Sequence, residues 1–273
     1  MDMDAYFARI GHAGARAPTL DTLAAVVLRH ALAIPFENID AFLGRRISLE
    51  PAAVEEKLVR QGRGGWCFEQ NLLLGEALRA LGFDVTDLAG RVVWGRSADA
   101  VAPRTHRLLL VRVEGGEWLA DVGFGGQMLA GPLNLRSGEP QQDSHAQFRL
   151  SRLGSEHLVS TLVRGDWLPM YRFDEHPQLP VDFEAANFQL VHDPASHFTQ
   201  QLVVSNLTAG GRHVLRGGEI AWHDPAGNST RRELGDPGTV IATLRDVFGL
   251  RIDGETAAAL AARLQAGSPG PSR

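Results

Sequence analysis

The chain has 273 residues, more than one small core usually holds and fewer than two large domains need, so two or three modest lobes are expected. Hydrophobic residues make up 44% of the chain and charged residues 22%, which is typical of a globular protein in water. The net charge of −5 excludes the class of proteins that grip a nucleic-acid backbone by bulk positive charge.

The numbers of turn-forming residues and of cysteines narrow the possible fold classes and kinds of site. Thirty glycines and 14 prolines favour a sheet-containing fold over an all-helical bundle. The single cysteine, Cys67, excludes an intramolecular disulfide and a four-cysteine zinc site, and we predict no metal site. No apolar run approaches the ~18 residues of a membrane helix, and residues 1–10 lack the pattern of a secretory signal. We therefore expect a cytoplasmic protein without a membrane partner.

The first part of the chain is predicted to be helical. An apolar stripe predicts a helix over residues 19–33, and a second helix is expected to carry Pro51 in its first turn. A third helix is predicted over residues 67–81, with Gly82 placed to end it. Together these helices predict a helical lobe over residues 1–84.

The pattern then changes to short β-rich runs separated by turn residues. Such runs predict an antiparallel sheet or barrel of about six strands, in a second lobe over residues 85–192. The expected strands are Val85–Trp94, His106–Val113, Glu117–Phe124, Gln147–Leu153, His157–Val163 and Trp167–Phe173.

The last part of the chain mixes strands and helices. We expect an irregular interdomain segment over residues 193–205, an α/β lobe over 206–265 and a disordered tail over 266–273. The expected elements are alternating strands within 201–223, with turns at Gly210-Gly211 and Gly217-Gly218, and helices over Val240–Phe248 and Glu255–Leu264.

The stretch RGGWCFEQN, residues 63–71, is the most informative for chemistry. Its glycines allow a sharp turn into a helix, which places Cys67 at the helix N-terminus, where free N–H groups favour a thiolate. The alternative is a buried structural cysteine, the commoner fate of a lone cysteine. Glu69, Gln70 and Asn71 are interpreted as polar residues that fix the start of the helix.

A histidine and an aspartate are the candidate partners of the cysteine. His106 follows Pro103 and opens an apolar strand, and the alternative is a solvent-exposed histidine at a strand end. Asp121 lies within an apolar run, where an aspartate needs a partner, and the alternative is a structural hydrogen bond to backbone.

The turn between their strands decides whether the two side chains can meet. A turn centred on residues 115–116 sets Asp121 four residues from His106 along the ladder, roughly 13 Å away and too far for a hydrogen bond. A turn centred on 114–115 reduces the offset to two residues, which is within reach of a diagonal pair. Both registers put the two side chains on one face, and a bulge would also bring them together.

If the three side chains converge, their chemistry is coherent. Asp121 orients His106 and supports its positive charge, and His106 deprotonates Cys67 and shuttles a proton. Cys67 then attacks a carbonyl carbon and holds the acyl group as a thioester. The backbone N–H of Cys67 is the first expected donor to the oxyanion.

The order and spacing of these residues resemble the arylamine N-acetyltransferase family. The matching motifs are RGGWCFEQN, IPFEN at 34–38, Thr105-His106, DVGFGG at 121–126, WLPMYRF at 167–173 and HDPASHF at 192–198. The similarity covers most of the chain and thins after about residue 200. One departure is Trp66, where the family often has tyrosine.

The resemblance implies an α+β fold with an N-terminal helical bundle, a central antiparallel β-barrel, a C-terminal α/β lid and a papain-like Cys-His-Asp core. It implies ping-pong transfer of an acetyl group from acetyl-CoA, the co-substrate, to an arylamine or arylhydrazine. Cys67 is then the nucleophile, His106 the base and Asp121 the residue that orients it.

The resemblance also implies substrate contacts. Flat apolar walls suit an aryl ring, and glycines let a pantetheine arm approach the backbone. Core packing of the aromatic residues and a simple strand end at the glycines are the alternatives. The implied residues are Phe36, Val93, Phe124 and Phe198 for the acceptor, and Gly125, Gly126 and His223 for coenzyme A.

Other functions for the same triad stay open at this point. One is an amide synthase that closes a macrocyclic polyketide, and another is a papain-like cysteine hydrolase. A degenerate binding module is disfavoured by the intact triad. The preferred acceptor amine, the tolerated acyl length, the pose of coenzyme A and the oligomeric state are not specified by the sequence.

Overall fold

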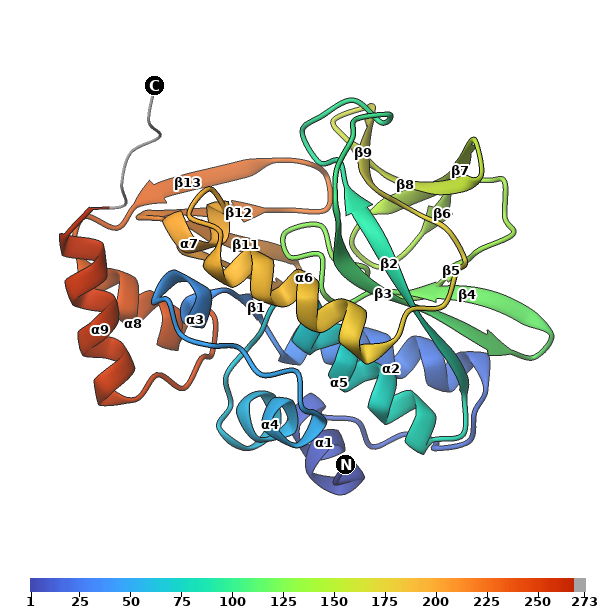
Figure 1. Ribbon diagram of the computed structural model, residues 1–273, viewed down its shortest axis with the longest axis horizontal. Helices are drawn as coiled ribbons and strands as arrows, with labels where there is room; N and C mark the ends of the chain where they lie inside the picture. Colours follow the sequence, from blue (N-terminus) through green and yellow to red (C-terminus); the bar gives the residue numbers. More distant parts are fainter. Residues whose placement is uncertain (268–273) are drawn as a thin grey trace.

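Three groups of elements follow one another along the chain in the computed structural model, which describes residues 1–267 (Figure 1). A helical group at the N-terminus is followed by an eight-stranded antiparallel sheet and then by a five-stranded sheet with two helices. This arrangement confirms the predicted α+β fold with a helical bundle, a barrel and an α/β lid. The predicted tail over 266–273 falls outside the described residues from residue 268 onward.

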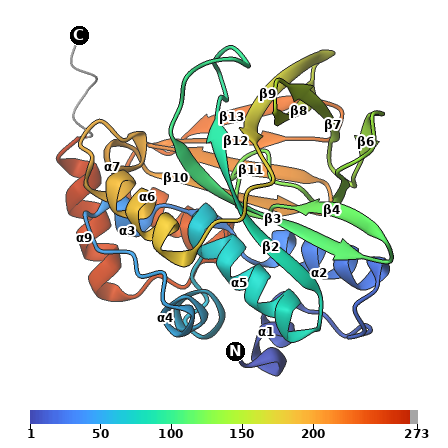
Figure 2. The ribbon, with the colours of Figure 1, turned by 45° about the vertical axis from the view of Figure 1, so that its right-hand side comes forward.

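The helical group surrounds one buried central helix, α5. Thr19 caps α2 by accepting from the Thr22 N–H, as expected for a helix beginning near residue 19. Most residues of α5 are buried, including the polar Gln70 and Asn71, and Figure 2 shows α5 beside β2 and β3. The helices are α1 (Met3–Ile10), α2 (Leu20–Ala33), α3 (Ile39–Phe42), α4 (Pro51–Glu55), which continues into a π-helical turn (Glu56–Arg60), and α5 (Cys67–Ala80).

The eight-stranded sheet curls into a nearly closed barrel in the order β5-β4-β3-β2-β9-β8-β7-β6. Its two end strands meet through a side chain, because the Gln141 amide bonds both the N–H and the C=O of Asn134, at 2.7 and 3.0 Å. The strands are β2 (Asp84–Val92), β3 (Arg104–Val113), β4 (Gly116–Ala120), β5 (Leu133–Asn134), β6 (Gln141–Gln142), β7 (Gln147–Leu153), β8 (Glu156–Val163) and β9 (Asp166–Phe173).

The β3–β4 hairpin adopts the predicted register in which the turn is centred on residues 114–115. Glu114 and Gly115 form its turn with φ of 51° and 73°, as a type I′ turn requires. Between β2 and β3 the pairing slips by one residue and leaves Thr105 as a bulge beside His106. A bulge bends its strand and re-aims neighbouring side chains, so the strand end carrying His106 is turned locally.

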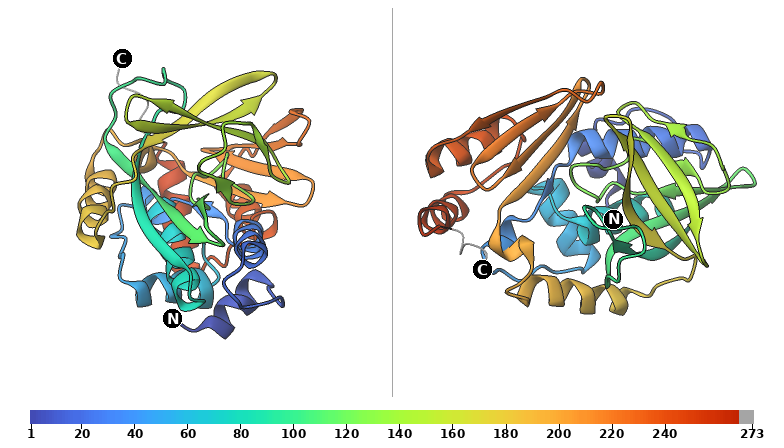
Figure 3. Two further views of the ribbon diagram at one scale, coloured as in Figure 1. Left: turned by 90° about the vertical axis from the view of Figure 1, so that its right-hand side faces the viewer. Right: turned by 90° about the horizontal axis from the view of Figure 1, so that it is seen from above.

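The lid is a five-stranded sheet in the order β1-β10-β11-β12-β13. One face packs against α8 and α9, and the other faces the helical lobe; from above, the lid sheet and the barrel lie on either side of α5 (Figure 3). Its edge strand β1 comes from the N-terminal lobe and ties the two together. The elements are β1 (Phe36–Glu37), β10 (Val203–Thr208), β11 (Gly211–Arg216), β12 (Glu219–His223), β13 (Ser229–Glu233), α8 (Pro237–Asp246) and α9 (Gly254–Gln265).

Two helices, α6 (Pro180–His192) and α7 (His197–Gln200), connect the barrel to the lid. The sequence did not predict α6, because its buried stripe of Phe183, Asn187 and Val191 has a polar residue at its centre. The buried Asn187 amide donates a hydrogen bond to the Ile47 carbonyl at 3.0 Å. Within residues 1–267, no helix combines the length and apolar character needed to cross a bilayer.

Candidate active site

Cys67 is the first residue of α5, as the glycine-rich stretch predicted. Its side chain is buried at 7% exposure, and its thiol lies 3.6 Å from the Thr105 carbonyl oxygen. Gly64 makes this turn possible, because a Cβ there would come within 2.2 Å of the Pro35 carbonyl oxygen. The unpaired N–H groups at the start of a helix favour negative charge on such a sulfur.

His106 and Asp121 form a buried pair. The His106 Nε2 atom lies 2.7 Å from the Asp121 Oδ2 atom. The Asp121 carboxylate also accepts hydrogen bonds from the Asn71 amide and the Gly123 N–H, each at 2.9 Å. Burial alone would raise the pKa of Asp121, but the charge and hydrogen bond of His106 and these two donors lower it. Asp121 therefore remains an anion in the interior.

The imidazole of His106 is held as a cation beside the sulfur. Burial disfavours its charge, but Asp121, and to a lesser degree Cys67, raise the pKa of His106 to about 10. Nε2 bonds Asp121, which leaves Nδ1 as the ring nitrogen available to Cys67. The rings of Phe124 and Tyr171 flank the imidazole at 5.4 and 4.8 Å between centroids, so its orientation is fixed on two sides.

Asn71 belongs to this site, although the sequence interpretation assigned it only to the helix start. Its amide donates to the Arg107 carbonyl at 2.6 Å and to Asp121, while its Oδ1 accepts from the Val122 N–H at 3.0 Å. It therefore ties α5 to β3 and to the segment after β4. The signal in the sequence was its spacing, since a residue four positions after Cys67 lies on the same helix face.

The loop after Asp121 passes very close to the nucleophile. A Cβ on Gly123 would come within 2.6 Å of the Cys67 Cα atom, so only glycine fits there. Gly125 has a φ of +77° and lies under the Phe36 ring, and Gly126 faces Val214 of the lid sheet, where a Cβ would be 3.3 Å from Cγ2. The two glycines predicted to contact coenzyme A thus lie between Cys67 and the lid.

A buried polar network holds the start of α5 from behind. His30 contacts the Tyr6 hydroxyl through Nδ1 at 2.9 Å and the Gln70 Oε1 atom through Nε2 at 2.7 Å. Burial lowers the pKa of His30 to about 4, so the ring is neutral and Nε2 donates. The Gln70 amide then donates to the Pro35 carbonyl at 2.8 Å, which confirms its expected role in fixing the helix start.

Ionic groups complete this support. Glu69 accepts from the Trp66 N–H at 3.2 Å and pairs with Lys57 at 2.7 Å. Burial raises the pKa of Glu69 to about 7, although Lys57 opposes the shift. Arg63 pairs with the buried Glu37 at 2.7 Å. These two ion pairs and the Trp66 N–H bond hold the loop before Cys67 from inside the protein.

The four residues expected at the acceptor cleft fall into different settings. Phe124 is half-buried against His106, whereas Phe36 and the half-buried Phe198 lie 6.1 Å apart between centroids. Trp66 meets Phe198 edge-on at 5.5 Å. Val93 is fully buried just after β2, where its N–H donates to the Met170 carbonyl.

His223 lies on the lid sheet, opposite Arg212 of β11 and Ser229 of β13. Its Nδ1 atom is 2.7 Å from the Ser229 hydroxyl. Burial lowers the pKa of His223, and the nearby cations of Arg212, Arg231 and Arg164 lower it further. Because strand partners share a face, His223 points to the same side of the sheet as Val214, which meets Gly126.

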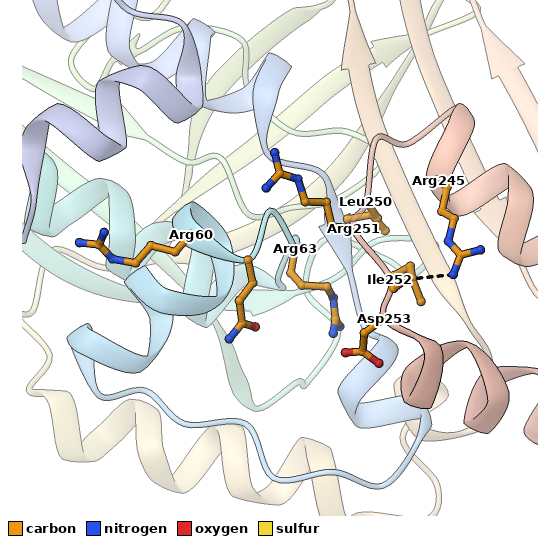
Figure 4. A pocket seen from close by; sticks show the side chains of 8 residues that line it. Arg60, Arg63, Arg245, Leu250, Arg251, Ile252 and Asp253 are labelled. Atoms are coloured by element: carbon orange, nitrogen blue, oxygen red, sulfur yellow. Dashed lines mark hydrogen bonds between the residues drawn. The ribbon is translucent and has the colours of Figure 1, made fainter.

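Two surface cavities, of about 580 and 700 Å³, lie away from the three side chains. The first is lined by four arginines behind the loop that precedes Cys67, and Figure 4 shows their guanidinium groups pointing in different directions. Charges that do not converge make a poor anion site, so this cavity is assigned no ligand. Among residues 1–267, no cluster of three metal-ligating acidic, histidine or cysteine side chains occurs.

Comparison with known proteins places the chain in a family. An N-acetyltransferase family model matches residues 19–257. Arylamine N-acetyltransferases of Mycolicibacterium smegmatis and Escherichia coli are 44% and 42% identical, with coverage of 82% and 91% of this chain and 82% and 88% of theirs. The structure of the Mycobacterium marinum arylamine N-acetyltransferase in complex with CoA aligns with a TM-score of 0.93 at 36% identity, covering 97% of this chain and 99% of that one. The resemblance drawn from the sequence is therefore confirmed, and the chain belongs to the arylamine N-acetyltransferase family of acyltransferase enzymes.

Proposed function

We propose that the chain transfers an acetyl group from acetyl-CoA to the nitrogen of arylamines and arylhydrazines, by a ping-pong mechanism through an acetyl-Cys67 thioester. The observation that carries the proposal is the 2.7 Å bond between His106 and Asp121 beside the thiol that opens α5. The family supports the same reaction, because the relatives are named arylamine N-acetyltransferases and one is solved with CoA.

In the first half-reaction the Cys67 thiolate attacks the thioester carbonyl carbon of acetyl-CoA. A new carbon–sulfur bond forms, the bond to the coenzyme A sulfur breaks, and the departing thiolate takes the proton held by His106. The Cys67 N–H is the first of α5 and has no intrahelical acceptor, so it is free to donate to the oxyanion.

In the second half-reaction the amine nitrogen attacks the acetyl carbon of acetyl-Cys67. His106, now neutral, accepts a proton from that nitrogen, and Cys67 leaves as a thiolate. Asp121 stabilises the imidazolium that results and restores the starting ion pair. The raised pKa of His106, about 10, supports a resting state in which the imidazole already carries its proton.

The acceptor ring is proposed to bind against Phe124, Phe36 and Phe198, with Val93 behind them. Phe124 contacts the His106 imidazole, so a ring stacked there would present its amine close to the thioester. Phe36 and Phe198 supply a second aromatic wall near the Gly125 loop.

Coenzyme A is proposed to run from the Gly125-Gly126 loop across the lid sheet to His223. Its phosphates need cations, and Arg212, Arg164 and Arg231 lie around His223. Within residues 1–267, Arg212 and Arg164 have no carboxylate partner, so their charges are available to an anion. Acetyl-CoA and the reduced thiol both fit a cytoplasmic location, which we propose for the enzyme.

The test is an intact-mass measurement. Incubation with acetyl-CoA should add one acetyl group to wild-type protein and none to the Cys67→Ala variant, and an aminobenzoate should remove it as the N-acetyl product. Discharge to water alone would instead support a cysteine hydrolase. An absent adduct, without release of free coenzyme A, would support an amide synthase or a binding module.

A further inference from the structure

Asn38 is the last residue of the IPFEN motif at 34–38 and takes no part in the two half-reactions. It immediately precedes α3, a position at which asparagine usually caps a helix with its side chain. Here the side chain makes no hydrogen bond to α3, although it is fully buried. A buried amide costs stability unless its donors and its acceptor are satisfied, so the partners of this amide indicate its use.

All three hydrogen-bond partners of the Asn38 side chain lie where α7 joins β10. Its Nδ2 group donates to the Phe198 carbonyl at 2.7 Å and to the Gln201 carbonyl at 2.8 Å. Its Oδ1 atom accepts from the N–H of Val203, the first residue of β10, at 2.7 Å. Both donors and the acceptor of one amide therefore hold the main chain on either side of this junction.

The bond to Phe198 matters because α7 cannot hold that residue by itself. The helix has only four residues, too few to be stable alone, and its N-cap Ser196 makes no side-chain cap. The carbonyl of Phe198 is among the last four of the helix, which have no intrahelical partner, and Asn38 supplies the missing donor. The residue that follows β1 thus sets the position of the Phe198 main chain.

From this anchored main chain the Phe198 side chain extends into a group of three aromatic rings. It lies 6.1 Å from the Phe36 ring and meets Trp66 edge-on at 5.5 Å between centroids. Phe198 is half-buried, so part of its ring is exposed. Phe36 is two residues before Asn38 in the chain. One short segment therefore carries one ring of the proposed acceptor wall and fixes the main chain of another.

We propose that Asn38 is a positioning residue for the acceptor, because it holds Phe198 in place against Phe36 in the wall assigned to the arylamine. An aryl ring gains contact from flat apolar walls only where they stand in the right place, and a displacement of ~1 Å loses much of that gain. Within residues 1–267, every side-chain bond of Asn38 goes to the α7–β10 junction. The inference rests on the proposed function and adds a residue that acts only in the second half-reaction.

Discharge of the acetylated enzyme tests this. Protein acetylated on Cys67 by acetyl-CoA and freed of the donor is mixed with an aminobenzoate or with hydrazine, a small nucleophile without a ring, and the loss of acetyl mass is followed. For Asn38→Ala the aminobenzoate concentration that gives half-maximal discharge should rise about tenfold, the worth of a well-placed aromatic contact. Discharge by hydrazine and acetylation by acetyl-CoA should each change less than about twofold.

A double variant shows whether Asn38 acts through Phe198. Phe198→Ala should raise the half-maximal aminobenzoate concentration by itself, and adding Asn38→Ala should raise it no further, because the ring that Asn38 positions is then gone. Asn38→Ser keeps one donor and should show the same split between the two acceptors at about threefold, which serves if Asn38→Ala does not fold.

The matched control is Asn206→Ala. Asn206 is a buried asparagine of β10 whose amide donates to the Val247 carbonyl at 3.0 Å. Its loss should lower the midpoint of thermal unfolding without separating the two acceptors. An equal loss with aminobenzoate and hydrazine, unaltered discharge by aminobenzoate, or additive losses in the double variant would overturn the assignment. Failure of the wild-type protein to acetylate Cys67, or to pass the acetyl group to the aminobenzoate, would instead overturn the proposed function.

Discussion

Asn71 differs from its neighbours in what its side chain holds. Glu69 and Gln70 stabilise the loop before α5, whereas Asn71 reaches across to the Asp121 carboxylate and to the Val122 N–H. A single amide therefore sets the position of Asp121 relative to the helix that carries Cys67. Sequence alone put all three in the first turn of the helix, and only the buried pairing with β3 and β4 separates their roles.

We predict that Asn71→Ala lowers kcat/KM about 10-fold to 100-fold, the worth of one hydrogen bond to a charged group. Loss of that donor also raises the pKa of Asp121 and weakens its hold on His106. Steady-state acetylation of an arylamine measures the effect.

The control for this variant is Asn187→Ala, which removes another buried asparagine that donates to a carbonyl far from the site. It should lower the midpoint of thermal unfolding with little effect on kcat/KM. If Asn71→Ala lost no more activity than Asn187→Ala at matched stability, Asn71 would have no role beyond packing.

At the scale of elements, the sequence predicted the long, regular helices and strands. It did not specify the turn that sets the register of the two strands beside the site. The strands over 147–153 and the helices over 19–33 and 67–81 were set by clean periodicity. The β3–β4 turn was not, because it puts Glu114 at positive φ, a conformation that an ordinary residue seldom adopts. The strand β13 was missed because its charged residues show no alternation.

The loop after β4 depends on glycine at one position. We predict that Gly123→Ala lowers the rate of Cys67 acetylation about 100-fold, because the new methyl would displace the backbone of Cys67 by a fraction of an ångström or more. Single-turnover mass measurement follows the rate. The matched change Gly138→Ala, at a glycine with open space around it, should leave that rate intact. Equal rates in both variants would show that the loop adapts without disturbing the site.

At the scale of the whole molecule, the site is assembled from parts that are distant in the chain. Cys67 and Asn71 come from α5, His106 from the bulged strand β3, and Asp121 from the position just after β4. The family resemblance placed Cys67, His106 and Asp121 near one another, whereas the sequence assigned Asn71 only to the helix start. Long-range strand pairing determines which face of the lid sheet is directed toward these residues, and local periodicity does not specify that pairing.

Two buried histidines have pKa values shifted in opposite directions, and we predict that together they favour a maximum in unfolding free energy near neutral pH. His30 has its pKa lowered to about 4, so its contribution is present above the unfolded value of 6.5 and is lost as pH falls toward 4. The full loss is about 3 kcal/mol of unfolding free energy, taken over ~2.5 units. His106 has its pKa raised to about 10, so its contribution is present below 6.5 and is lost as pH rises toward 10.

We therefore predict that His30→Gln flattens the fall in unfolding free energy between pH 6.5 and 5, and that His106→Gln flattens the fall between pH 7 and 9. Denaturant titrations at fixed pH measure both. Glu69 acts against His30, because its raised pKa of about 7 favours the folded state as pH falls, so the difference between wild type and variant isolates the histidine. A His30→Gln protein that loses stability in acid as steeply as wild type would mean that burial of this ring does not govern the acid limb.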